Sequence, residues 1–219
     1  MHEGVFELEV ISLASLTVHL TIAVDSMRGL QIAKPEQFLL GAIAPDSIPS
    51  SEKAFTHYAE RISGRPYYRW EQFLDEYAQS DELDYVLGYL CHLITDEEWD
   101  RYVRHPLKAR AEYMQLPDRR ERTYAEMSRL DILVRPDEPT RQQIAKHLSS
   151  AVFPGLPDGL NHQSVIECIA WVTKDLFKNH TSLQTEYIGL EVVESVIRSA
   201  CLKTVRIARL LTRVVDSRR

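Results

Sequence analysis

The stretch ELDYVLGYLCHLITDEEWDRYV, residues Glu82–Val103, decides the fold. Its apolar side chains recur at steps of three and four residues, which is the periodicity of an α-helix, and they cover much of its circumference. A helix that is apolar over much of its girth needs other helices around it. The sequence therefore predicts a central helix over this stretch, and we expect Pro106 to end it.

Similar periodicity predicts further helices on both sides of this one. The spacing of Leu13, Leu16, Leu20 and Val24 predicts a first helix from about Ser12 to Leu30. Ser149–Asn161 contains two prolines and two glycines and is expected to be a loop. No stretch alternates as a strand does. We predict an all-α protein, a multi-helix bundle that forms one domain over residues 1–219. The remaining helices are expected at Lys53–Arg61, Tyr67–Tyr77, Asp118–Leu133, Pro139–Leu148, His162–Phe177 and Leu190–Val215.

Composition narrows the class of protein. A hydrophobic content of 44% and a charged content of 26% are ordinary for a folded globular chain. The net charge of −6 argues against a general nucleic-acid binder, so we expect no nucleic-acid partner. Three cysteines without a CxxC pair indicate a reducing compartment. The apolar segment from Val10 to Val24 is interrupted by His19 and preceded by acidic residues, so we interpret it as a core helix of a cytoplasmic protein.

Two carboxylates and two imidazoles stand beside apolar runs: Asp46 in GAIAPDSIPS, His57 in KAFTHY, and His92 and Asp96 in GYLCHLITDEEW. A helix places His92 and Asp96 one turn apart on one face, within reach of one ion. Taken singly, each residue has an ordinary interpretation: His/Asp pairs at this spacing are common, and an aspartate between two prolines is often a turn residue. Together they form a nitrogen and oxygen ligand set for a divalent metal, zinc first and manganese or iron as alternatives.

These three motifs, in this order, resemble the zinc-dependent phospholipase C family, particularly its shorter bacterial members of intracellular appearance. The resemblance extends over residues 15–131, more than half of the chain. It implies an all-α bundle of the phospholipase C type with the metal site in a cleft between helices. It also implies that one zinc has four ligands: Asp46, His57, His92 and Asp96.

The resemblance further implies a second ion, which in the secreted enzymes is completed by a histidine on the first helix and by an amino-terminal tryptophan. His19 matches that histidine, although a lone histidine on an apolar helix face is also common as a core residue. The tryptophan has no match, because this chain starts Met1-His2. Tyr102 stands where a third zinc would need a histidine, so we expect one ion, or two with His19.

Two further residues are candidates for supporting roles. Lys53, four residues before His57, is expected in solvent, with the alternative that it faces the cleft and neutralises a substrate phosphate oxygen. Asp131 is expected either to orient a ligand histidine or to pair with Arg135 on a helix surface.

These features support two hypotheses of function. The first is a metal-dependent, phospholipase C-like hydrolase that cleaves a small-molecule or lipid phosphoester with metal-activated water, with Asp46 doubling as general base. The alternative is a non-catalytic helical bundle with a structural or regulatory metal. The substrate and the oligomeric state are left open.

The last predicted helix is basic and amphipathic, which is compatible with peripheral membrane contact. We favour the interpretation that its apolar side is core and its basic side is a solvated outer face. The basic residues are Lys203, Arg206, Arg209 and Arg213, and the apolar ones are Leu202, Val205, Leu210 and Val214.

Overall fold

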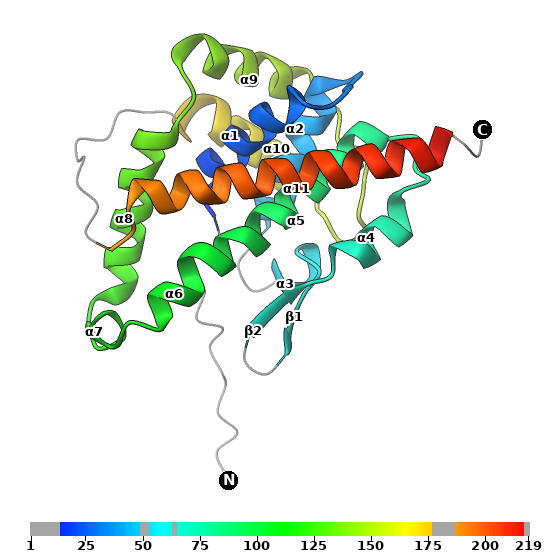
Figure 1. The fold of residues 1–219 in the computed structure, drawn as a ribbon. Helices are drawn as coiled ribbons and strands as arrows, with labels where there is room; N and C mark the ends of the chain where they lie inside the picture. The colour runs from blue at the N-terminus through cyan, green and yellow to red at the C-terminus, as the bar shows by residue number, and fades with distance from the viewer. Residues whose placement is uncertain (1–13, 49–52, 63–64, 177–186, 217–219) are drawn as a thin grey trace.

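The computed structural model describes residues 14–48, 53–62, 65–176 and 187–216, and these are mostly helical (Figure 1). The elements in chain order are α1 (Leu16–Met27), α2 (Pro35–Ile43), the 3₁₀ turn η1 (Ala44–Ser47), α3 (Lys53–Thr56), β1 (Ala59–Ile62), β2 (Arg65–Tyr68), α4 (Trp70–Tyr77), α5 (Leu83–Trp99), the π-helical turn η2 (Asp100–Arg104), α6 (His105–Lys108), α7 (Ala111–Met114), α8 (Arg119–Val134), α9 (Glu138–Ser150), α10 (His162–Trp171), the π-helical turn η3 (Val172–Leu176) and α11 (Leu190–Asp216).

Helix α5 is the centre of the molecule, as the sequence predicted. Helices α1, α2, α4 and α11 all pack against it, and every side chain from Tyr85 to Asp96 is buried (Figure 1). Burial on all sides explains why this helix is apolar over most of its girth. The polar residues that it does bury, His92 and Asp96, must therefore find partners inside the protein.

Helices α2 and α5 approach each other through two glycines. A Cβ atom added to Gly88 would lie 1.9 Å from the carbonyl oxygen of Phe38, and one added to Gly41 would lie 2.2 Å from the carbonyl oxygen of Tyr85. Only glycine permits backbones this close. The contact matters for the site because Asp46 follows α2 and His92 lies one turn beyond Gly88.

Several elements differ from the sequence-based expectation. Residues 59–62 and 65–68 form an antiparallel hairpin, so the prediction of no strand was wrong, and the helix expected over 53–61 ends at Thr56. Helix α2 was not among the expected helices. Pro106 does not end the central helical segment, because η2 and α6 continue it to Lys108. Pro106 is tolerated there because it lies in the first turn of α6, where its missing N–H is not needed.

The later helices agree with the prediction to within a few residues at each end. Helices α8, α9 and α11 lie where they were expected, and α10 with η3 covers the predicted helix up to Leu176, beyond which it lies outside the described residues. The loop predicted to start at Ser149 starts at Ala151.

Helix α11 corrects one interpretation. Its buried face consists of Val193, Val196, Ala200, Thr204 and Ala208, whereas Leu202, Leu210 and Val214 are exposed. The expectation that those three side chains belong to the core was therefore wrong. Among the described residues, no helix has both the length and the apolar composition needed to cross a membrane.

Candidate metal centre

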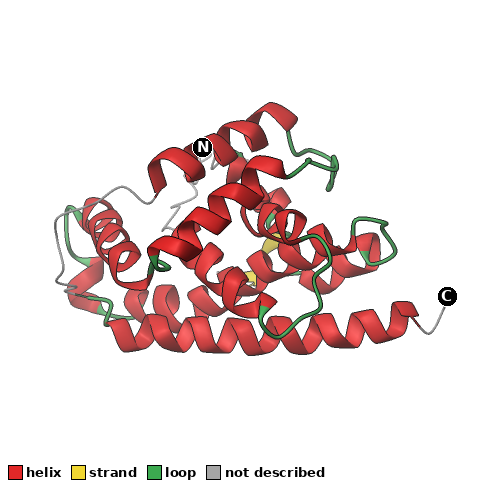
Figure 2. Cartoon of the chain, turned by 90° about the horizontal axis from the view of Figure 1, so that it is seen from above, coloured by secondary structure: helices red, strands yellow, loops and turns green. Residues whose placement is uncertain are grey.

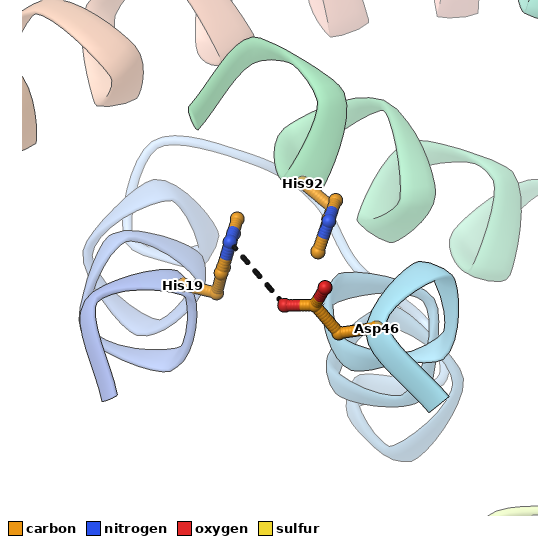
Figure 3. A group of neighbouring side chains, drawn as sticks. All are labelled: His19, Asp46 and His92. Carbon is orange, nitrogen blue, oxygen red and sulfur yellow. Dashed lines mark ion pairs between the residues drawn. The ribbon is translucent and has the colours of Figure 1, made fainter. Parts of the chain in front are cut away.

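Four parts of the fold bring the predicted ligand residues together. His19 comes from α1, and Asp46 comes from η1 at the end of α2. His57 directly follows α3, while His92 and Asp96 lie one turn apart on α5. Figure 3 shows His19, Asp46 and His92 directed toward one another from their three elements.

The local backbone fixes where Asp46 and His57 lie. Pro45 stands at the start of the 3₁₀ turn η1, so Asp46 lies in a short regular turn where an irregular loop was expected. The hydroxyl of Thr56 donates to the Pro45 carbonyl over 3.1 Å and so ties α3 to this turn. Tyr58, with φ of 48°, then leads the chain away from α3 toward β1. The turn and α3 thus hold Asp46 and His57 as a unit.

The hydrogen bonds of His57 and His92 define their tautomers. The Nδ1 atom of His92 lies 2.9 Å from the Ala42 carbonyl oxygen, and the Nδ1 atom of His57 lies 2.8 Å from the Lys53 carbonyl oxygen. A carbonyl only accepts, so each Nδ1 carries a proton and donates it. In a neutral imidazole the Nε2 atom then presents a bare lone pair. The two Nε2 atoms lie 3.1 Å apart, and two lone pairs facing each other at that distance repel unless a proton or a metal ion lies between them.

The distances between donor atoms match the edges of a metal tetrahedron. For bonds of about 2.1 Å to zinc, the ligand atoms of a regular tetrahedron lie about 3.4 Å apart. The Nε2 atom of His57 lies 3.4 Å from Asp46 Oδ1 and 3.2 Å from Asp96 Oδ2. The Nε2 atom of His92 lies 3.3 Å from the same Asp96 oxygen. These spacings, with that between the two imidazoles, can enclose one ion.

His19 adds a fifth donor on the other side of this set. Its ring stacks on that of His92, with centroids 3.8 Å apart and planes inclined by 3°. Its Nε2 atom lies 3.4 Å from Asp96 Oδ1. The same atom lies 3.9 Å from Asp46 Oδ2 (Figure 3). Neither ring nitrogen has a hydrogen-bond partner among the described residues, although the side chain is fully buried. Buried ring nitrogens normally have a hydrogen-bond partner, so the His19 imidazole calls for an ion or a water beside it.

Both carboxylates are held in the ionised form. Burial alone would raise the pKa of Asp96, but the His92 and His19 imidazoles lower it below its ordinary value. Burial likewise opposes ionisation of Asp46, and the neighbouring His57 imidazole together with the Lys53 charge lowers its pKa well below the ordinary range. Two ionised carboxylates beside three imidazoles form a site suited to a divalent cation.

Among the described side chains of the centre, Asp46 and Lys53 are the more exposed ones. The side chains of Asp46 and Lys53 are 7% and 23% exposed, whereas those of His57 and Asp96 are 1% exposed or less. The Lys53 ammonium donates a hydrogen bond to Asp46 Oδ1. The expectation that Lys53 is a solvated surface lysine was therefore wrong, because Lys53 is largely buried and paired with Asp46.

Asp131 supports the centre from farther away than we expected. Its carboxylate accepts a hydrogen bond from the Ser15 hydroxyl, and the same Ser15 oxygen accepts from the Val18 N–H at 3.2 Å as the N-cap of α1. The Asp131 contact therefore anchors the helix that carries His19.

Three contacts of the centre were missed by sequence reasoning. The Ala14 N–H donates to Asp96 Oδ1 over 3.3 Å, and the Ala42 carbonyl orients His92. Tyr68 is buried near Asp96, and its pKa is raised by burial and by that negative charge. Backbone partners carry no sequence signal. Tyr68 belongs to the unpredicted hairpin, so no pattern pointed to it.

Comparison with known proteins adds no family assignment. No model of a protein family matches the chain, and no curated protein or solved structure matches it significantly. The likeness to the zinc-dependent phospholipases C rests on the three motifs alone.

Proposed function

We propose that this chain is a metal-dependent hydrolase of phosphoesters, with zinc as the first candidate metal. The observation that carries the proposal is the cluster of His57 Nε2, His92 Nε2 and Asp96 Oδ2, which lie 3.1–3.3 Å from one another, with Asp46 Oδ1 3.4 Å from His57 Nε2. Without a cation, the same atoms would bury two carboxylates and three imidazoles with few hydrogen bonds, which is costly.

A catalytic role is favoured over a structural one by His19 and by the position of Lys53 beside Asp46. Four protein ligands alone would close a structural zinc site, and they would leave both nitrogens of His19 without a partner. A further ion or a bound water beside His19 would satisfy it. Lys53, whose side chain is 23% exposed beside Asp46, would mark the side from which a substrate approaches.

The residues can be given roles on this basis. His57, His92 and Asp96 would hold the ion, and the bound ion would supply a water with its pKa lowered toward about 7. Asp46 would accept the proton of the attacking water, because it lies on a short turn and can shift more easily than a ligand on α5. Lys53 would exchange its contact with Asp46 for a phosphoryl oxygen of the substrate. The positive charge of Lys53 beside Asp46 favours a phosphoester over an uncharged ester as the substrate.

The test combines metal content with turnover. Protein purified without added metal is analysed for zinc, manganese and iron per chain, and is assayed on a phosphodiester and a phosphomonoester. We expect one or two ions per chain and metal-dependent hydrolysis. His92→Ala should lose both the ion and the activity, and Asp46→Asn should lose activity while the helical circular dichroism is kept. His105→Ala, an exposed histidine on α6, is the matched control.

Two results would contradict the proposal. One is hydrolysis that Asp46→Asn leaves unchanged. The other is a single tightly bound ion with no turnover on any ester, which would favour the structural alternative. In that case chelation should lower the melting temperature strongly, since a structural metal contributes directly to folding.

A further inference from the structure

Helix α11 carries a charge pattern that the proposed site does not use. The sequence SVIRSACLKTVRIARLLTRVV, residues 195–215 and thus most of α11, contains five basic residues and no acidic one, although the chain has a net charge of −6; the acidic residues of α11, Glu191, Glu194 and Asp216, lie at its two ends. Exposed positions recur there every three or four residues, so they share one face of the helix. We call this the α11 basic face, and it consists of Arg198, Leu202, Arg206, Arg209, Leu210, Arg213 and Val214.

Two leucines of this face are unusually exposed to solvent. Leu202 is 67% exposed and Leu210 is 54% exposed. Leu202 stands one turn from Arg198 on one side and one turn from Arg206 on the other. A single exposed leucine would need no explanation. On one exposed surface, leucines can enter the interface of a bilayer while the long side chains of neighbouring arginines keep their charges at the headgroups.

The positive charge of the face is only partly used inside the protein. Lys203, at the border of the face, pairs with Glu97, and Arg209 donates to the Gly29 carbonyl oxygen over 2.7 Å. The side chains of Arg198, Arg206 and Arg213 form no ion pair within the described part of the chain.

The neighbouring helix α1 does not offset this charge. It carries Asp25 and Arg28, which form an ion pair at 2.8 Å, so their opposite charges nearly cancel. The face therefore keeps a net positive charge.

We propose that the α11 basic face docks on an anionic lipid bilayer. The arginines would bind lipid phosphates, and Leu202 and Leu210 would enter the boundary between headgroups and acyl chains. Helix α11 has 27 residues, about 40 Å of length, and lies along one edge of the molecule with its C-terminal end beyond the other helices (Figure 2). A straight ridge of this kind fits a flat surface. The proposal is independent of the hydrolase activity.

Sedimentation with lipid vesicles tests this docking. The full chain is mixed with vesicles of phosphatidylcholine alone, or with about one third phosphatidylglycerol, at low and high salt. We expect binding to the anionic vesicles only, weakened by salt. Removing two charges in Arg206→Gln/Arg213→Gln should lower the partition coefficient about 30-fold, at about 1 kcal/mol per arginine. Leu202→Ser should lower it about tenfold and leave the salt dependence unchanged.

The matched control makes the same charge change elsewhere. Arg65→Gln/Lys146→Gln removes two exposed basic residues on β2 and α9 and should bind as the wild type does. Melting curves verify that each variant folds. No binding to anionic vesicles, equal binding to neutral ones, or equal binding by the Arg206/Arg213 variant overturns the proposal. A dimer that Leu202→Ser dissociates, without vesicle binding, also overturns it and assigns the face to a second copy of the chain.

Discussion

Replacing Gly88 with alanine should destabilise the protein, although helix propensity alone predicts the opposite. Gly88 lies inside α5, where alanine is favoured over glycine by up to about 1 kcal/mol. In the structure the added Cβ would lie 1.9 Å from the Phe38 carbonyl oxygen and 2.7 Å from its carbonyl carbon. Ordinary contacts of carbon with oxygen are about 3.3 Å or longer, so α2 and α5 would have to separate by about 1.4 Å.

The size of the effect follows from the atoms that clash. Both are backbone atoms of packed helices, which cannot move aside as a side chain can. The free-energy cost of the clash should therefore lie at the upper end of the range for overpacking substitutions, about 3 kcal/mol or more. After the gain in propensity, we expect a net loss of about 2–3 kcal/mol in the free energy of unfolding. For a domain of this size that lowers the melting temperature by about 4–12 °C.

The same separation should weaken the metal centre. It would lengthen the 2.9 Å hydrogen bond that orients His92 on the Ala42 carbonyl, and loss of such a bond lowers metal affinity about 10- to 100-fold. Urea unfolding and zinc titration measure the two effects. Gly29→Ala is the control, because its new Cβ would approach closely only the Val205 side chain, at 3.0 Å, which can adjust, and would lie at an ordinary 3.6 Å from the Ser26 carbonyl oxygen. A Gly88→Ala protein as stable as the wild type, with unchanged zinc affinity, would refute the close approach of α2 and α5.

Three further predictions concern the first helix, a buried thiol and the stability of the fold at acid pH. Ser15→Ala removes the N-cap of α1 and the contact with Asp131, and urea unfolding should show a loss of about 1–2 kcal/mol. Burial raises the pKa of Cys91 to about 12, so at pH 8 mass spectrometry should show its alkylation about a thousandfold slower in the folded than in the unfolded chain; equal rates would contradict its burial. The pKa values of Asp46 and Asp96 are lowered on folding, so in metal-free protein these carboxylates stabilise the fold above about pH 4, and the contribution is lost as the pH falls further. Asp96→Asn should flatten this decline in acid melting curves.

The sequence alone identified the central helix and the residue types of the candidate centre. Both signals are local: apolar side chains repeat every three or four residues along α5, and His92 and Asp96 lie one turn apart on it. The hairpin was missed because its strands, AERI and RPYY, are only four residues long and do not alternate clearly between apolar and polar side chains.

The tertiary structure decided what those residues can do together. The sequence supplied Asp46, His57, His92 and Asp96, but their convergence depends on the glycine contact between α2 and α5, which joins residues about fifty positions apart. The tautomers of the two histidines depend on backbone carbonyls, to which any residue contributes equally, so no sequence pattern encodes them.

The side of α11 that faces solvent was likewise settled only by packing. An amphipathic sequence does not state which of its apolar residues a neighbouring helix will cover, and α1 and α5 bury a narrow face of small side chains and leave Leu202 and Leu210 exposed. Residue chemistry and helical periodicity can be derived from the sequence alone. Distances between donor atoms, hydrogen-bond partners and exposed faces arise only when the helices pack, because each depends on atoms from separate parts of the sequence.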